Sequence, residues 1–171
     1  GLFVWGVTNI AISSSIKSTP QFEKISVNGK ADGLPAGVSP SQVKMLFGTS
    51  RLIALVTCDG AAYVLSMQYA NNQGDGLSLH DTQWARVKIN ATTTLDNVVA
   101  IRGSITTLIA LTSDNKVYTW GEKTLLGTEN SYNVQSRPYA TEMSLPETSP
   151  IKMIGLTSWD KYHESNKSTA N

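Results

Sequence analysis

The feature that most constrains this chain is an internal repeat with a period of roughly 55 residues. The two clearest copies are residues 52–65 and 108–120. In each, an apolar run is followed by a pair of turn-forming residues and then by a run rich in β-branched and aromatic residues. Upstream of these copies, residues 43–48 match residues 98–103 at the same period. Several features that recur in one order at one spacing predict a repeat architecture.

The alignment within the repeat needs one gap. Tyr63 and Tyr118 are separated by one period, whereas the leading leucines Leu52 and Leu108 are separated by one position more. We therefore infer that the earlier copy lacks one residue in this stretch. With that gap, Leu55 and Leu111 are expected to occupy equivalent buried positions.

Each unit has the signals of β-structure. Short apolar runs are bounded by Asp59-Gly60 and by Asp114-Asn115, which tolerate positive φ and predict two-residue hairpin turns. No segment shows a sustained helical period, and the prolines fall between the predicted strands. About four antiparallel strands in each unit predict an all-β fold made of β-propeller blades.

Fainter copies extend the repeat to both ends of the chain. Residues 2–6 resemble 117–121, Phe22 matches Trp84, and residues 151–155 begin the unit again. The resulting division of the chain is the second half of a blade at 1–37, full blades at 38–91 and 92–149, and the first strand of a further blade at 150–171. We expect the chain to be a fragment of a larger protein.

Charge and composition exclude several classes of function. The net charge is +1 and only 16% of residues are charged, so the chain gives no electrostatic reason to expect a nucleic-acid partner. No apolar run approaches the roughly 18 residues that span a membrane, so no direct membrane insertion is expected. The single cysteine, Cys58, excludes a disulfide framework and is predicted to be a buried structural residue.

Residues able to support chemistry are few. His80 and His163 lie far apart in sequence and are predicted to be surface residues. Lys44 and Arg102 are the only charged residues on the predicted inner strands, and two cations do not form an acid–base set. Residues 71–76 carry oxygen ligands but lack the closing glutamate of a calcium loop. We therefore assign no catalytic, cofactor-binding or metal-binding residues.

The aromatic residues recur at fixed places in the repeat. Trp5, Tyr118 and Trp120 share one region of the unit, and Phe22 shares another with Trp84. Large rings at repeated positions are predicted to fill the space between neighbouring blades.

The third unit resembles a known repeat family. Residues 103–121 are similar to the repeat of the regulator of chromosome condensation family, which has a Leu-x-Ala-Leu strand, an Asp-Gly turn and a Val-Tyr-x-Trp-Gly strand. Leu126-Gly127 and Arg137-Pro138 fit later parts of that pattern. Thr106 stands where the family often has histidine, and Leu65-Ser66 replaces Trp-Gly in the earlier unit. These departures favour a divergent, bacterial relative.

The resemblance implies a propeller that is usually seven-bladed. It also implies a range of roles, because members act as guanine nucleotide exchange factors, as inhibitors of other proteins and as modules of larger surface proteins. We expect a non-catalytic interaction or adhesion module within a large exported bacterial surface protein, at an extracellular or cell-surface location, with the cytoplasm as the alternative. The alternative functions are an exchange-factor-type regulator and an enzyme whose active site lies on blades outside this chain.

The expected contacts lie in the loops, because these differ most between repeats. The partner would be another protein or a surface ligand, and the remaining blades of the same polypeptide would pack alongside. The predicted partner contacts are Tyr69, Asn72, Asp75, Tyr132, Trp159 and Tyr162. Replacing residues 69–81 or 129–139 by short turns is expected to leave folding intact and to weaken binding.

Overall fold

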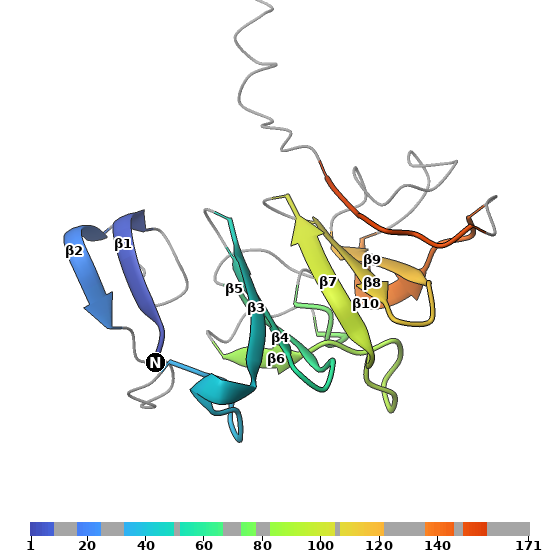
Figure 1. The fold of residues 1–171 in the computed structure, drawn as a ribbon, viewed down its shortest axis with the longest axis horizontal. Coiled ribbons are helices and arrows are strands. Elements are labelled where there is room, and N and C mark those ends of the chain that lie inside the picture. Colours follow the sequence, from blue (N-terminus) through green and yellow to red (C-terminus); the bar gives the residue numbers. More distant parts are fainter. Residues whose placement is uncertain are drawn as a thin grey trace, which may run out of the picture.

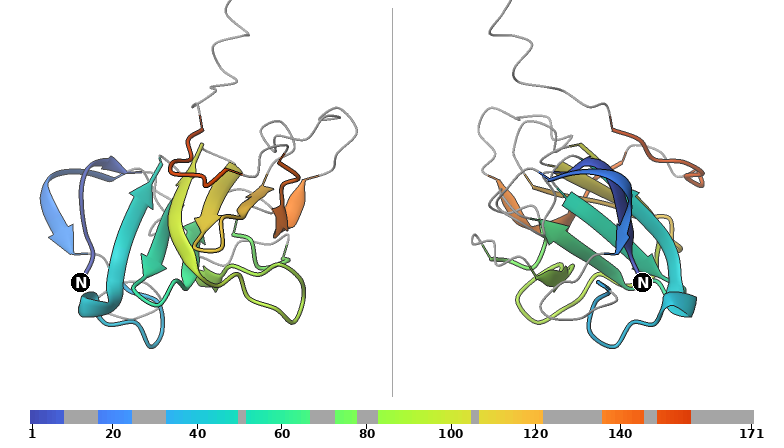
Figure 2. Two further views of the ribbon diagram at one scale, coloured as in Figure 1. Left: turned by 45° about the vertical axis from the view of Figure 1, so that its right-hand side comes forward. Right: turned by 90° about the vertical axis from the view of Figure 1, so that its left-hand side faces the viewer.

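A computed structural model describes residues 1–8, 17–24, 33–49, 52–66, 73–77, 83–104, 107–121, 136–145 and 149–156. These residues form three antiparallel sheets that lie side by side in chain order (Figure 1). Seen from other directions, the sheets fan out rather than stack flat (Figure 2). The all-β prediction of four-stranded propeller blades is confirmed.

The first sheet pairs β1 (Phe3–Thr8) with β2 (Lys17–Lys24). A short 3-10 helix, η1 (Pro40–Gln42), leads into the second sheet. The second sheet has four strands in chain order, which are β3 (Val43–Gly48), β4 (Leu52–Thr57), β5 (Ala62–Ser66) and β6 (Trp84–Arg86). The third sheet repeats this order with β7 (Val98–Gly103), β8 (Thr107–Thr112), β9 (Val117–Gly121) and β10 (Arg137–Glu142).

The second and third sheets match strand by strand at one constant period over their first three strands. In β4 and β5, Leu55 lies opposite Tyr63; in β8 and β9, Ala110 lies opposite Tyr118. The equivalent of Leu55 is therefore Ala110 and not Leu111. Both leucines are buried. The predicted equivalence is wrong by one residue, and the alignment of the two sheets needs no gap. Because side chains alternate along a strand, this shift places the two leucines on opposite faces of their sheets.

The hairpin turns also differ from the prediction by one position. Thr57 N–H bonds to the carbonyl oxygen of Ala61 at 2.9 Å, so residues 58–60 form the loop. The same bond joins Thr112 to Lys116 at 3.0 Å. In both loops the last residue has positive φ, as three-residue hairpin loops require.

Two apolar clusters hold the sheets together. The larger lies between the second and third sheets, and β7 packs against β3 and β4. Its fully buried members include Leu52, Val64, Ile101 and Trp120. The smaller cluster joins the first sheet to the second and consists of Leu2, Leu34, Val38 and Leu55. Trp120 thus packs between blades as predicted.

The predicted packing of Trp5 and Phe22 is wrong. Trp5 is 66% exposed and Phe22 is 73% exposed, and their rings lie 6.1 Å apart on the first sheet. The physical reason is that no described sheet lies against this face of β1 and β2. The repeat supplies the ring positions, but burial also needs an opposing surface.

Candidate interaction surface and its scaffold

Two hairpin turns are hydrogen-bonded to the chain segment that follows their own sheet. Val98 N–H donates to the carbonyl oxygen of Gly60 at 3.0 Å. At the equivalent place, Ile151 N–H donates to Oδ1 of Asn115. Val98 begins β7, so the first bond links the second sheet to the third, whereas Ile151 lies outside the described strands.

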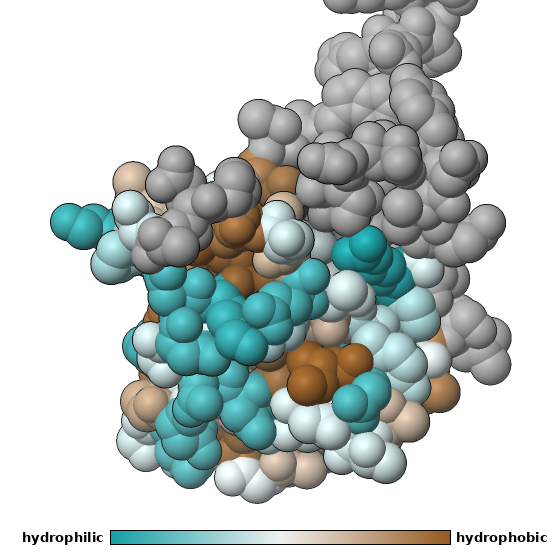
Figure 3. Space-filling model, turned by 90° about the vertical axis from the view of Figure 1, so that its right-hand side faces the viewer, coloured by the Kyte–Doolittle hydropathy of each residue, from teal (hydrophilic) through white to brown (hydrophobic). Residues whose placement is uncertain are grey.

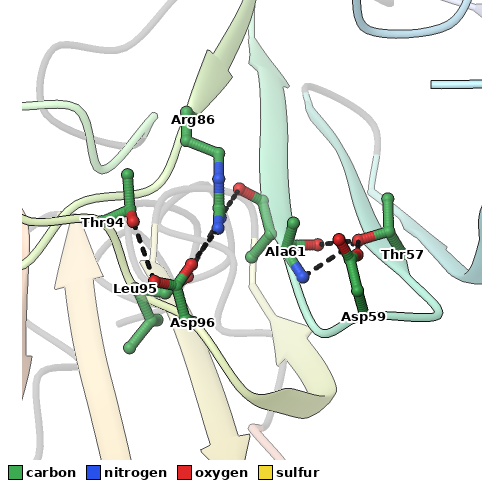
Figure 4. A network of polar contacts seen from close by, with 8 residues as sticks. Thr57, Asp59, Ala61, Arg86, Thr94, Leu95 and Asp96 are labelled. Atoms are coloured by element: carbon green, nitrogen blue, oxygen red, sulfur yellow. Dashed lines mark hydrogen bonds and ion pairs between the residues drawn. The ribbon is translucent and has the colours of Figure 1, made fainter. Parts of the chain in front are cut away.

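Arg86, at the end of β6, makes a second connection (Figure 4). Its Nη1 donates to the carbonyl oxygens of Ala62 at 2.9 Å and Leu95 at 3.0 Å, and its Nη2 pairs with Asp96. The guanidinium carbon also lies 5.2 Å from the centre of the Tyr63 ring. One side chain therefore ties the second sheet to the segment that leads into β7. The sequence offered no signal for this role beyond the presence of a charge close to Trp84.

Asp59 lies in the β4–β5 turn and accepts a hydrogen bond from the hydroxyl group of Thr57. That hydrogen bond is the main cause that lowers the pKa of the Asp59 carboxyl. The Thr57 hydroxyl also accepts from Ala61 N–H at 2.9 Å. These contacts order the turn that holds Val98 of the next blade.

Lys116 and Tyr118 share one acceptor on β10. The Lys116 ammonium lies 3.1 Å and the Tyr118 hydroxyl 3.4 Å from Oε2 of Glu142. The Glu142 hydrogen bond raises the pKa of Lys116, and burial raises the pKa of Tyr118. Both charged side chains are about half exposed, so this pair contributes little to stability.

The described part of the β5–β6 loop, residues 73–77, packs on the third sheet. Gly76 N–H donates to the carbonyl oxygen of Pro138 at 2.9 Å, and a Cβ on Gly74 would lie 2.8 Å from Nε1 of Trp120. Asp75 forms a β-bridge with Tyr139 and is half buried. Exchanging the whole of residues 69–81 would remove these contacts with Trp120 and β10, and its effect on folding stays a prediction.

The other predicted contacts, Tyr69, Asn72, Tyr132, Trp159 and Tyr162, lie outside the described residues, as do His80 and His163. Their roles remain predictions. Leu77, which sequence reasoning did not select, is 58% exposed, and its N–H donates to Oδ1 of Asp75 at 3.0 Å. Its only sequence signal was an apolar residue within a polar loop.

The two inner-strand cations do not face a common partner. Lys44 is exposed on β3, whereas Arg102 on β7 donates to the carbonyl oxygen of Ile101 at 2.7 Å and lies 3.7 Å from Sδ of Met45. Cys58 is exposed in the β4–β5 turn, so its predicted burial is wrong. The reason is that the loop starts one residue earlier than the sequence suggested, which moves Cys58 off the strand.

Within the described residues, no three His, Cys, Asp or Glu side chains come together as metal ligands. The same residues contain no helix that is both long enough and apolar enough to cross a membrane.

No family model matches the chain, and no curated protein matches it in sequence. Solved structures do match. Yeast RCC1 (Prp20) bound to Kap60 has a TM-score of 0.63 at 16% identity, covering 88% of this chain and 33% of that one. Human WBSCR16 has a TM-score of 0.59 at 16% identity, with coverage of 84% and 35%. Prp20p from Saccharomyces cerevisiae has a TM-score of 0.62 at 15% identity, with coverage of 88% and 34%.

The chain thus spans about one third of the length of these solved chains. The structural similarity extends over most of the present chain although the sequence identity is low, so it shows a shared fold. Together with the constant period of the strands and the four-stranded antiparallel sheets, it establishes the architecture. The chain is part of a divergent β-propeller of the RCC1-like fold.

Proposed function

We propose that this part of the propeller is a non-catalytic protein-interaction module that binds through the loops between its third and fourth strands. The observation that carries the proposal is a contrast within the repeat. The strands β3–β5 and β7–β9 keep one constant period, whereas the β5–β6 connection at 67–83 and the β9–β10 connection at 122–136 differ in length. When the scaffold of a repeat protein is constant and its loops differ, the loops are the parts that can determine which partner is bound.

The described end of the first of these loops supports the proposal. Residues 73–76 are held against Trp120 and β10, and Leu77 follows them with an exposed side chain. A loop whose base is anchored on the scaffold loses less conformational entropy when its tip binds a partner. The likeness to yeast Prp20, which was solved bound to Kap60 and whose binding to Gsp1p and histones has been studied, is consistent with a protein partner.

We further propose that the module belongs to a large exported bacterial protein and works at the cell surface or outside the cell. Support comes from the low fraction of charged residues, 16%, and the net charge of +1. A surface dominated by hydroxyl and amide side chains suits adhesion through many weak polar contacts.

The alternative function is a regulator of the guanine-nucleotide-exchange type, which the structural likeness to yeast RCC1 favours. An enzyme is the weaker alternative, because on β3 and β7 the charged side chains are Lys44 and Arg102 alone.

A loop exchange tests the proposal. Residues 78–82 are replaced by glycine and serine, which spares the packed residues 73–76, and a matched control replaces the exposed tip 91–93 of a different loop. Partners captured on the wild-type chain are identified and their affinities measured with each variant. We expect the loop variant to lose binding at least tenfold while the control and the unfolding temperature stay unchanged. Unchanged binding in the loop variant, together with nucleotide release from a small GTPase that Lys44→Ala and Arg102→Ala abolish, would overturn the proposal.

A further inference from the structure

We propose that Asn90, in the loop between β6 and β7, is an acceptor site for N-linked glycosylation. The triplet Asn90-Ala91-Thr92 has the acceptor pattern, which is asparagine, any residue except proline, and then serine or threonine. Such a triplet can accept a sugar only where the fold exposes the asparagine side chain. This modification site is separate from the β5–β6 and β9–β10 loops and does not depend on which partner those loops bind.

The triplet lies at the tip of a short hairpin that is anchored in the core. Leu95 N–H donates to the carbonyl oxygen of Val87, and Ile89 N–H donates to that of Thr93, each at 2.9 Å. Val87 and Leu95 are 0% and 3% exposed and belong to the cluster between the second and third sheets. The loop between β6 and β7 runs outside the sheets (Figure 2). A transferase can therefore reach the tip while the base stays folded.

The surface around the tip suits a hydrated substituent. All four tip residues, 90–93, are exposed. The side of the molecule that carries the third sheet shows mainly polar residues around a smaller apolar area (Figure 3). A sugar attached at the tip would project into water and would displace no packed side chain.

Hydrogen bonds determine which atom of the Asn90 amide faces outward. Its Oδ1 accepts from Thr92 N–H at 3.0 Å, from Thr93 N–H at 2.9 Å and from the Thr92 hydroxyl at 3.1 Å. Backbone N–H groups only donate, so the atom that they face is the amide oxygen. Nδ2, the atom that would carry the sugar, lies on the other branch of the amide and donates to no residue in the described part of the chain. It is therefore available for reaction.

The other asparagines within the described ranges lack one or both of these properties. Asn115 uses both ends of its side chain, because Nδ2 donates to the carbonyl oxygen of Ser149 at 3.3 Å and Oδ1 accepts from Ile151 N–H. Asn97 is exposed but has valine, not serine or threonine, two positions further along. Asn90 thus combines exposure, a free amide nitrogen and the required hydroxyl group.

The reaction is a glycosyl transfer from a sugar diphosphate donor. The bond that forms joins Nδ2 of Asn90 to the anomeric carbon of the sugar. The bond that breaks joins that carbon to a phosphate oxygen of the donor, and the diphosphate leaves with the bonding electron pair. The proton lost from Nδ2 passes to a base of the glycosyltransferase. A nucleotide-linked monosaccharide and a lipid-linked oligosaccharide would both form this bond, and they differ in the mass that they add.

Peptide mass mapping of the protein, isolated from the cells that naturally produce it, tests the proposal. Trypsin cleaves after Lys88 and Arg102, which places Asn90 and Asn97 together on the peptide 89–102. The second acceptor triplet, at 166–168, lies outside the described residues and falls elsewhere in the digest. We expect a sugar on the peptide 89–102, and fragmentation should locate it on Asn90. A single hexose indicates the nucleotide-linked donor, and an oligosaccharide indicates the lipid-linked donor.

Variants made in the same cells separate the site from its surroundings. Asn90→Gln and Thr92→Val should each abolish the modification, whereas Thr92→Ser should retain it. Asn97→Asp, at an exposed asparagine of the same peptide, is the matched control and should leave the modification unchanged. Unfolding temperatures of all variants show whether a loss of sugar reflects misfolding. An unmodified peptide from the natural protein, a sugar located on a threonine, or a sugar retained in Thr92→Val would overturn the proposal.

Discussion

Gly60 and Asn115 hold the same position in successive blades, and both have positive φ, 84° and 66°. Each also supplies an oxygen to the segment that follows its sheet. The Gly60 backbone carbonyl accepts from Val98 N–H at the start of β7, and the Asn115 side-chain amide accepts from Ile151 N–H. Glycine and asparagine are the residues that tolerate this backbone conformation best. The turn thus serves the hairpin and the contact between blades at once.

The close approach at Gly60 predicts a large cost for Gly60→Ala. A Cβ there would lie 2.8 Å from Cα of Asn97, in addition to the strain of a positive φ. Gly37→Ala is the matched control, because Gly37 has φ +78 and nothing within 4 Å of the added Cβ. We expect a loss of about 1–2 kcal/mol in the free energy of unfolding for the control and about 3 kcal/mol or more for Gly60→Ala. Equal losses by urea denaturation would contradict a contact between blades at this turn.

Trp120 and Trp5 have equivalent positions in the repeat, but their burial predicts very different contributions to the free energy of unfolding. Trp120→Ala removes a fully buried ring from between two sheets and should cost about 3–5 kcal/mol. Trp5→Ala removes a ring that is mostly exposed and should cost less than about 1 kcal/mol. Thermal and urea unfolding of both variants checks this, and similar values for the two would show that the sheets do not pack as described.

The hydrogen bonds of Arg86 predict that its role is more than an ion pair. Arg86→Met leaves the carbonyl oxygens of Ala62 and Leu95 without this donor and should cost about 1–3 kcal/mol. Asp96→Asn removes only an exposed charge and should cost less than about 1 kcal/mol. The loss in Arg86→Met should persist at about 1 M salt, where exposed ion pairs are screened. A loss that salt abolishes would show that the ion pair with Asp96 dominates.

The lowered pKa of Asp59 predicts how the stability of the fold changes with pH. A carboxyl whose pKa is lower in the folded chain than its ordinary value of 3.8 stabilises the fold above that value. The stabilisation is lost as the pH falls through the folded-state pKa. Asp59→Asn should therefore narrow the difference in unfolding temperature between neutral pH and pH values below 3.8. An unchanged difference would mean that the Thr57 hydrogen bond does not favour the charged carboxyl.

The period, the strand content and the class of fold follow from the amino-acid order alone. Repeated apolar runs with Asp59-Gly60 and Asp114-Asn115 between them are local signals, because turn conformations depend on the residues that adopt them. The place of Trp120 between blades also followed from the repeat. These features need no knowledge of what lies against each face.

The register, the exposure and the connections between blades depend on the packed sheets. All six residues of β4 are buried, so this strand shows no alternation from which its register could be read. Trp5 and Trp120 have equivalent sequence positions but opposite environments, because burial depends on the opposing sheet. Arg86 and residues 73–76 act through residues distant in sequence. A local pattern determines what a segment can form, whereas only the packed neighbours determine which of its faces is covered.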